Sequence, residues 1–134
     1  MTQKMFINLP ISDVARTREF FGKLGYTFNE QFSNEQAICM PINEDAFVMM
    51  LQNDTFATFI DKTIIDAKSN VEVLVSLSFD SVDAVKDFSE KAFALGGRNY
   101  KEPLDMGFMF SWGFEDLDGH IWEAFWMNPN HVQG

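Results

Sequence analysis

The residues most able to do chemistry lie near the end of the chain, in the stretch DLDGHIWEAFWM, residues 116–127. His120 and Glu123 stand there among aromatic side chains, and both residue types bind metal ions or transfer protons in proteins. On a β-strand, however, alternate residues point to opposite faces, so His120 and Glu123 would point away from each other. The spacing therefore argues against a shared metal site, and we expect His120 to be a polar group at the start of the strand.

Glu123 has two interpretations from the sequence alone. Alternation along a strand can simply place its carboxylate on a solvated face. Alternatively, the side chain points into a cleft among apolar neighbours such as Ile121 and Phe125. In that environment the carboxylate would act as a proton acceptor, or as an anchor for a cationic or hydrogen-bonding ligand. Glu123 is the candidate catalytic residue.

Composition bounds the class of protein. A chain of 134 residues with 46% hydrophobic and 22% charged residues is typical of one globular domain. The aromatic content of 15%, including 15 Phe, indicates either a large core or an aromatic-lined cavity or subunit interface. The formal charge of −10 argues against a nucleic-acid partner, because phosphates need Lys and Arg opposite them.

Cysteine usage and hydropathy indicate the compartment. The single cysteine, Cys39, excludes an internal disulfide, and its apolar surroundings AICMPI predict a buried position. The N-terminal stretch lacks the apolar core of a signal peptide, and no segment approaches the length of a membrane span. We therefore expect a cytoplasmic protein without a membrane partner.

The chain contains an internal repeat. Residues 7–25 and 75–97 each predict a short alternating strand, a polar helix cap, an amphipathic helix and a glycine stop. A shift of 68 positions superposes Leu9 on Leu77, Val14 on Val82 and Phe20 on Phe88. The apolar stripes predicted for the two helices are Val14, Thr17, Phe20, Phe21 and Leu24, then Val82, Val85, Phe88, Ala92 and Leu95.

Three β-like runs follow each predicted helix. They are YTFNEQFS (26–33), AICMPI (37–42) and AFVMMLQ (46–52), then RNYKEP (98–103), GFMFSWGFE (107–115) and HIWEAFWM (120–127). Each half of the chain therefore predicts a βαβββ module. We expect one domain over residues 1–134, with modules at 1–52 and 71–128, a linker at 53–70 that can hold a short helix, and a tail at 129–134.

Two βαβββ modules in one short chain resemble the vicinal oxygen chelate superfamily, which includes glyoxalases, ring-cleaving dioxygenases and bleomycin-resistance proteins. The resemblance is carried by residues 6–28, FINLPISDVARTREFFGKLGYTF, and by residues 114–127, FEDLDGHIWEAFWM. The motif D-x-D-G-x-x-W-E, residues 116–123, is similar to the signature that ends in a metal-binding glutamate in the glyoxalases. The resemblance implies an α+β fold of two modules whose curled mixed sheets form a cleft.

The resemblance also implies four positions for the ligands of a divalent metal ion. They correspond to Phe6, Met49, Leu74 and Glu123, and only Glu123 has a side chain suited to such an ion. Met sulfur is soft and favours copper over the ions that these enzymes use. The sequence therefore predicts a protein without a complete metal site and without another cofactor, although a divalent metal remains the less favoured alternative.

Further residues complete the predicted ligand-binding cleft. Asn8 and Ser76 lie two positions beyond Phe6 and Leu74, so they share the same strand faces and can orient a ligand. Trp112, in the SWGF segment, either lines the cleft or packs between the sheets.

Two function classes remain open, with a third behind them. The first is a metal-free protein that binds a small molecule in an aromatic, acidic cleft, as bleomycin-resistance members do. The second is a lactoylglutathione lyase-like or other metal-dependent enzyme of the same superfamily, and the third is an interaction protein. Because open curled sheets need partners at their edges, we also expect a homodimer, and pairing of the modules within or between chains stays open.

Overall fold

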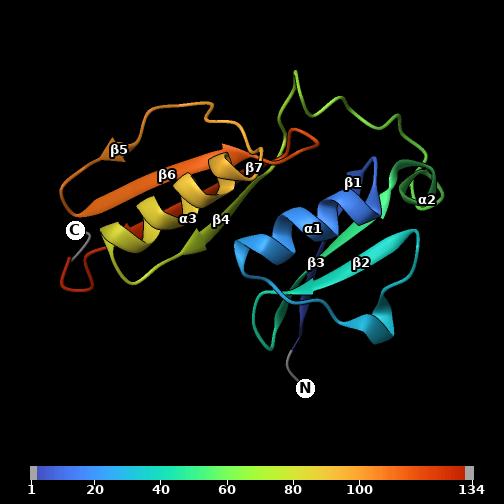
Figure 1. The fold of residues 1–134 in the computed structure, drawn as a ribbon, viewed down its shortest axis with the longest axis horizontal. Coiled ribbons are helices and arrows are strands. Elements are labelled where there is room, and N and C mark those ends of the chain that lie inside the picture. Colours follow the sequence, from blue (N-terminus) through green and yellow to red (C-terminus); the bar gives the residue numbers. More distant parts are fainter. Residues whose placement is uncertain (1–2, 132–134) are drawn as a thin grey trace. The chain divides into compact units, whose positions relative to one another are not determined.

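The computed structural model describes residues 3–131. The chain divides into two compact units, residues 1–65 and 66–134, and the division falls inside the predicted linker. Each unit contains one mixed β-sheet and one long helix (Figure 1).

The first unit is a three-stranded sheet with the order β1-β3-β2. Its middle strand pairs in parallel with β1 and antiparallel with β2, so the sheet is mixed. Its elements are β1 (Met5–Ile11), α1 (Val14–Leu24), the 3-10 turn η1 (Glu30–Phe32), β2 (Ala37–Pro41), β3 (Ala46–Gln52) and the short helix α2 (Asn53–Ala57). The short helix lies at the start of the predicted linker, where one was expected.

Helix α1 forms because local signals at both ends agree with its apolar stripe. The Asp13 carboxylate accepts a hydrogen bond of 3.0 Å from the backbone N–H of Arg16, which satisfies one free donor of the first turn. Gly25 ends the helix with a φ of 120°, a conformation that side-chain-bearing residues rarely adopt. The predicted stripe is confirmed, because the buried residues of α1 are Val14, Thr17, Phe20, Phe21 and Leu24.

The strand predicted at residues 26–33 is wrong. In its place the chain makes the 3-10 turn η1, because polar side chains bond to nearby backbone groups instead of a neighbouring strand. The Asn29 side chain accepts from the N–H of Gln31 at 3.1 Å, and the Ser33 hydroxyl donates to the Asn29 carbonyl at 2.6 Å. None of the residues of η1 is buried, and Phe32 is exposed.

The second unit is a four-stranded sheet with the order β4-β7-β6-β5. Strand β7 pairs in parallel with β4 and antiparallel with β6, so this sheet is also mixed. Its elements are β4 (Leu74–Ser78), α3 (Val82–Ala94), β5 (Leu104–Asp105), β6 (Met109–Glu115) and β7 (Ile121–Met127).

The segment predicted as a strand at residues 98–103 makes only one isolated bridge, between Arg98 and Glu115. Pro103 carries no N–H and cannot donate to a ladder, so regular pairing begins after it, at the two-residue strand β5. The Asp105 carboxylate then accepts from the N–H of Gly107 at 2.9 Å, and the chain turns into β6.

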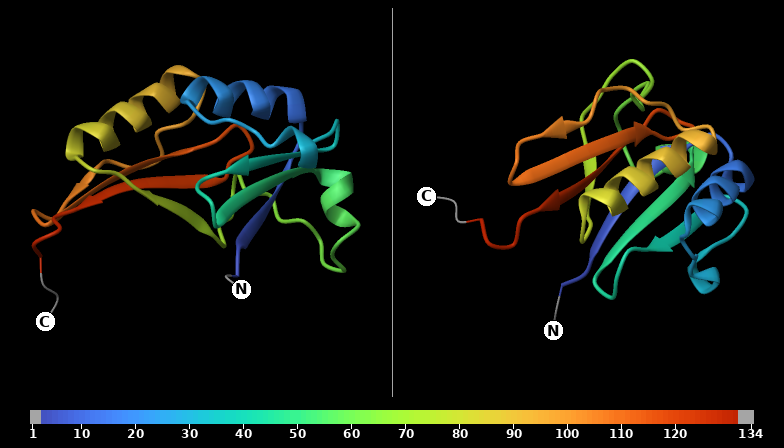
Figure 2. Two further views of the ribbon diagram at one scale, coloured as in Figure 1. Left: turned by 90° about the horizontal axis from the view of Figure 1, so that it is seen from below. Right: turned by 60° about the vertical axis from the view of Figure 1, so that its left-hand side comes forward.

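Helix α3 covers one face of the second sheet (Figure 2). The Ser81 hydroxyl caps it by accepting from the N–H of Ala84 at 3.0 Å. Val85 of the helix packs with Phe110 of β6 and Ala124 of β7. Partly buried apolar residues surround this cluster, namely Phe79, Val82, Phe88, Trp112 and Trp126.

The predicted fold class is confirmed, because the chain is α+β with two mixed sheets that do not close into barrels. None of the helices within residues 3–131 has the length and hydropathy needed to cross a membrane.

Candidate functional site

Glu123 lies on the face of the second sheet that points away from α3. Its neighbours Trp122 and Ala124 are fully buried, and Ala124 belongs to the cluster beneath α3, so the alternation of β7 turns Glu123 to the other side. Strand register sets Ser76 of β4 and Gly113 of β6 on either side of Glu123. We call this surface the open face of the second sheet.

Tyr100 reaches the same place from the segment between α3 and β5. Its hydroxyl oxygen lies 3.1 Å from the position that a Cβ atom on Gly113 would occupy. Such a Cβ would also collide with the carbonyl oxygen of Trp122. The collision with this backbone oxygen explains a glycine in the interior of a strand, and Tyr100 would also have to shift slightly to admit a side chain at position 113.

Tyr100 and Glu123 interact electrostatically. Burial raises the pKa of the Tyr100 hydroxyl, and the negative charges of Glu123 and then Glu115 raise it further. The hydroxyl therefore stays protonated at neutral pH and remains a hydrogen-bond donor. Tyr100 was not predicted as a site residue, because it belongs to no regular element. The available indication in the sequence was Gly113, since a glycine within a strand often marks the close approach of another group.

The two carboxylates of the open face differ in their partners. Glu115 forms an ion pair with Arg98, with 3.7 Å between the carboxylate and guanidinium atoms. The Glu123 carboxylate makes no hydrogen bond or ion pair within residues 3–131, and neither does the Tyr100 hydroxyl. Glu123 and Tyr100 thus present an acceptor and a donor that the described protein itself does not use.

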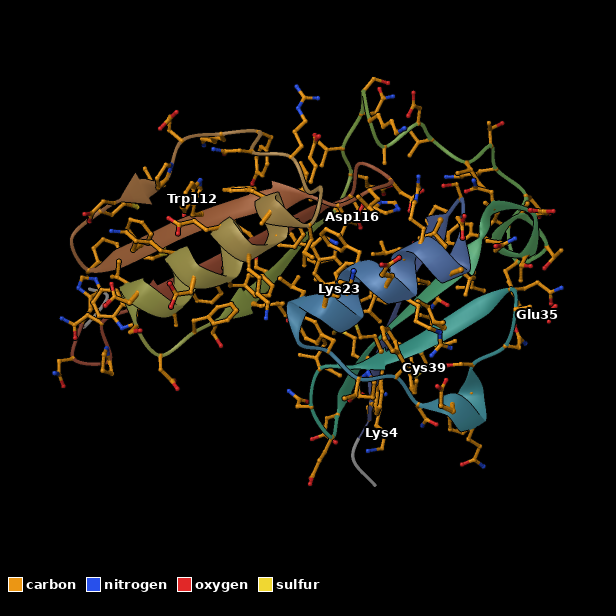
Figure 3. The ribbon with its side chains drawn as sticks, in the orientation of Figure 1. Lys4, Lys23, Glu35, Cys39, Trp112 and Asp116 are labelled. Atoms are coloured by element: carbon orange, nitrogen blue, oxygen red, sulfur yellow. The ribbon has the colours of Figure 1, made fainter. Side chains whose placement is uncertain are left out.

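The turn that joins β6 and β7 is built around the buried carboxylate of Asp116 (Figure 3). One oxygen accepts from the backbone N–H groups of Asp118 and His120 at 2.9 and 3.0 Å. The other accepts from the indole N–H of Trp122 at 2.9 Å. These bonds tie the D-x-D-G turn to the strand that carries Glu123.

Burial raises the pKa of the Asp116 carboxyl group. The charge of His120, the indole of Trp122 and the two backbone donors oppose this rise. His120 stands before the first residue of β7, and its backbone N–H and carbonyl both bond within the turn to Asp116. The first aspartate of the D-x-D-G-x-x-W-E motif is therefore structural, a role that was not predicted for it.

Trp112 does not share a face with Glu123. Its register partner is Ala124, and its ring lies 5.1 Å from the ring of Phe93 of α3. Its indole nitrogen is 3.4 Å from the side-chain oxygen of Asn99. Trp112 was expected either to line the cleft or to pack between the sheets, and it packs beneath α3, on the face opposite Glu123.

The other predicted residues lie on comparable rows of the two sheets. In the first sheet Asn8 pairs with Met49, and Met49 pairs with Cys39, which is fully buried. In the second sheet Ser76 pairs with Glu123 in the same parallel arrangement. Met49 therefore occupies the place in the first unit that Glu123 occupies in the second.

The remaining two predicted positions lie one row away from these pairs. Phe6 stands two residues before Asn8 and stacks on Phe47 at a ring separation of 4.6 Å. Leu74 stands two residues before Ser76 and is exposed. Both side chains point to the same faces as their polar neighbours.

The side chains at the four implied metal positions do not fit a hard or borderline cation. Phe6, Met49 and Leu74 offer no nitrogen or oxygen donor, which leaves Glu123 alone. Within residues 3–131, no group of three or more His, Cys, Asp or Glu side chains is placed to hold a metal ion. A single carboxylate does not define a metal centre.

A cleft of about 580 Å³ lies in the first unit, at the start of α1, and contains none of the predicted site residues. Of its charged groups, Asp13 caps α1 and Arg18 pairs with Glu30 at 2.9 Å, and the remaining one, Glu35, is exposed to solvent. We therefore place the candidate site on the open face of the second sheet.

Comparisons with known proteins agree with this fold. A sequence model described as bleomycin resistance protein-like N-terminal matches residues 3–43. A glyoxalase-related enzyme from Fulvimarina pelagi superposes with a TM-score of 0.81 at 20% identity, covering 100% of this chain and 94% of that one. A hypothetical protein from S. aureus gives 0.79 at 24% identity, covering 93% and 94%.

The genomically encoded fosfomycin resistance protein FosX from Listeria monocytogenes superposes with a TM-score of 0.68 at 16% identity, covering 94% of this chain and 93% of that one. None of the curated proteins matches the chain in sequence. The chain has the glyoxalase/bleomycin-resistance fold, which is the fold that the resemblance to the vicinal oxygen chelate superfamily implied.

The Asp116 turn yields a prediction on stability. Asp116→Asn keeps the shape of the side chain but replaces one acceptor oxygen with an NH2 group that faces N–H donors. We expect a loss of about 1–3 kcal/mol in the free energy of unfolding, because a buried donor is left unpaired. Urea denaturation measures the loss. Asp105→Asn is the matched control, since its amide can still accept from Gly107, and a loss of equal size there would contradict this interpretation.

The proximity of Tyr100 and Glu123 yields a second prediction. Glu123→Gln removes a negative charge that raises the pKa of Tyr100, so this pKa should fall. The other tyrosine, Tyr26, has a pKa raised to about 12 by burial and should not move. Alkaline titration followed by near-ultraviolet absorbance separates the two groups. Glu102→Gln is the control, and an equal change in both variants would show that Glu123 does not lie beside Tyr100.

Proposed function

We propose that this glyoxalase/bleomycin-resistance-like protein binds a small cationic molecule on the open face of the second sheet, with Glu123 as the anchor. The observation that carries this proposal is the unequal pairing of two neighbouring carboxylates. Glu115 already has Arg98 as a partner, whereas Glu123 has none within residues 3–131. The formal charge of −10 favours the approach of a cation from solution.

Two hydroxyl groups support the same assignment. Ser76 is the register partner of Glu123, and the Tyr100 hydroxyl lies over Gly113 on its other side. A cation that carries N–H groups can donate to the Glu123 carboxylate and to a hydroxyl oxygen at the same time. Such charge-assisted hydrogen bonds are stronger than neutral ones and fix the orientation of the ligand.

We propose that this binding does not use a metal ion. The support is the donor set, because three of the four positions where the superfamily holds its metal are Phe6, Met49 and Leu74. The alternative, a lactoylglutathione lyase-like or other metal-dependent enzyme, would need donors at these positions.

Glu123→Gln tests the proposal with butylammonium as the probe cation. We expect the variant to keep its fold, or to gain slightly in stability, and to lose about tenfold or more in affinity, because a charge-assisted hydrogen bond contributes about 1.5–3 kcal/mol. Isothermal titration calorimetry measures the affinity. Tyr100→Phe should cause a smaller loss, and Glu102→Gln, an exposed change in the same unit, should cause none.

The same titration, repeated after treatment of the protein with a chelator, tests the proposal that binding does not use a metal ion. We expect an unchanged affinity for butylammonium. Loss of binding on chelation would favour the metal-dependent alternative, whereas an unchanged affinity in Glu123→Gln would make the carboxylate a bystander and overturn the proposal.

We also propose a homodimer. Strands β1 and β4 are edge strands of their sheets, and each carries an exposed apolar residue, Phe6 and Leu74. Light scattering at micromolar concentration should give twice the monomer mass of 15.4 kDa. Leu74→Lys should weaken the dimer, because a charged edge strand resists pairing. Leu104→Lys, on the opposite edge of the same sheet, is the control, and a monomeric parent protein would contradict the proposal.

A further inference from the structure

The open face changes from polar to apolar along β7. Next to Glu123, the neighbours on the sheet are a serine and a glycine. Phe125 stands two residues further along β7, and its register partner is Ser111 of β6. Ser111 in turn pairs with Leu104 of β5, so Phe125 and Leu104 lie in one row across the face.

The next row along the open face is built from methionines. Met127 of β7 pairs with Met109 of β6. The N–H of Met106 then donates to the Met109 carbonyl at 2.8 Å, which brings a third methionine to the same end of the sheet. We call Leu104, Met106, Met109, Phe125 and Met127 the apolar end of the open face.

Three of the five residues of this apolar end are exposed, and Met109 and Phe125 are half-buried. The exposed fractions are 44% for Leu104, 49% for Met106 and 38% for Met127. Apolar side chains grouped on one surface mark binding sites more often than side chains scattered singly. Methionine suits this use, because its unbranched chain adapts to ligands of different shape.

The Glu123 row and the apolar end are close enough along β7 to contact one ligand. Four residues along a β-strand span about 13 Å, so the Met127 row lies within the length of a medium alkyl chain from the Glu123 row. A carboxylate without a protein partner therefore stands at one end of an exposed apolar track.

Two kinds of partner could cover this surface, a second copy of the chain or a small molecule, and charge distinguishes between them. A second copy of the chain carries the same net charge of −10, and self-pairing of this face would bring Glu123 and Glu115 toward their counterparts. A small cation with an apolar tail meets both parts of the surface with complementary groups.

We infer that the ligand is an amphiphilic cation, with its charged group at Glu123 and its alkyl or aryl tail along the apolar end. This inference rests on the proposed function above, and it adds the chemical class of the remainder of the ligand. Selectivity among cations then comes from the length of the tail, because each methylene that leaves water adds affinity.

A series of alkylammonium ions from ethyl to octyl tests the inference by calorimetry on the full chain. We expect the affinity to rise about two- to fourfold for each added methylene throughout this series, because an octyl tail is shorter than the distance of about 13 Å to the methionine row. Hexanoate carries a similar tail with the opposite charge, and it should bind at least about tenfold more weakly than hexylammonium.

Two substitutions separate the tail from the charged group. Leu104→Thr with Met127→Thr should flatten the dependence on chain length and leave the affinity for ethylammonium unchanged. Threonine retains strand propensity, and both positions are exposed, so the sheet should tolerate it. Val71→Thr is the control, since Val71 is 60% exposed and lies outside the strands. The single variants serve if the double variant fails to fold.

The outcomes distinguish this inference from the proposed function. If butylammonium binds through Glu123 but the affinity does not depend on chain length, the inference is wrong and the proposed function stands. If the double variant keeps the full dependence, the tail binds elsewhere and the inference is wrong. If no alkylammonium binds, or the double variant only dissociates a dimer that involves this face, the amphiphilic ligand is excluded.

Discussion

The candidate site depends on the buried carboxylate of Asp116. Its three hydrogen bonds close the turn between β6 and β7 and reach the indole of Trp122, six residues further along the chain. This interaction sets the register of the hairpin. A slip of one residue would turn Trp122 toward solvent and bury Glu123 beneath α3, because side chains alternate along a strand. The position of the Glu123 carboxylate is thus a consequence of the turn that precedes it.

The two units use the same strand arrangement for different chemistry. In each sheet a parallel pair places a small polar residue beside the position of interest, Asn8 beside Met49 and Ser76 beside Glu123. Only the second unit has a carboxylate there. The two sheets therefore share one strand arrangement, while the side chains at the corresponding positions differ in chemistry. Fold and activity are separable in this way, since function resides in particular side chains.

Local signals predicted those parts of the fold in which neighbouring residues agree. The stripe of α1, its cap and the glycine that ends it lie within one short segment, and all were found where the sequence placed them. The strands predicted at residues 26–33 and 98–103 do not form, and the causes are again local. In the first, Asn29 and Ser33 bond to the backbone beside them, and in the second, Pro103 lacks the N–H that a ladder requires.

The sequence by itself determined the internal repeat, the α+β class and the strand that carries Glu123, because periodicity and caps are written in consecutive residues. Only the tertiary structure decided which side chains meet that carboxylate. Tyr100 comes from an irregular segment, and it reaches the open face because Gly113 leaves room for it. Trp112 lies on the opposite face, because register with Ala124 turns it toward α3. Such contacts depend on pairing between distant segments, which no local pattern encodes.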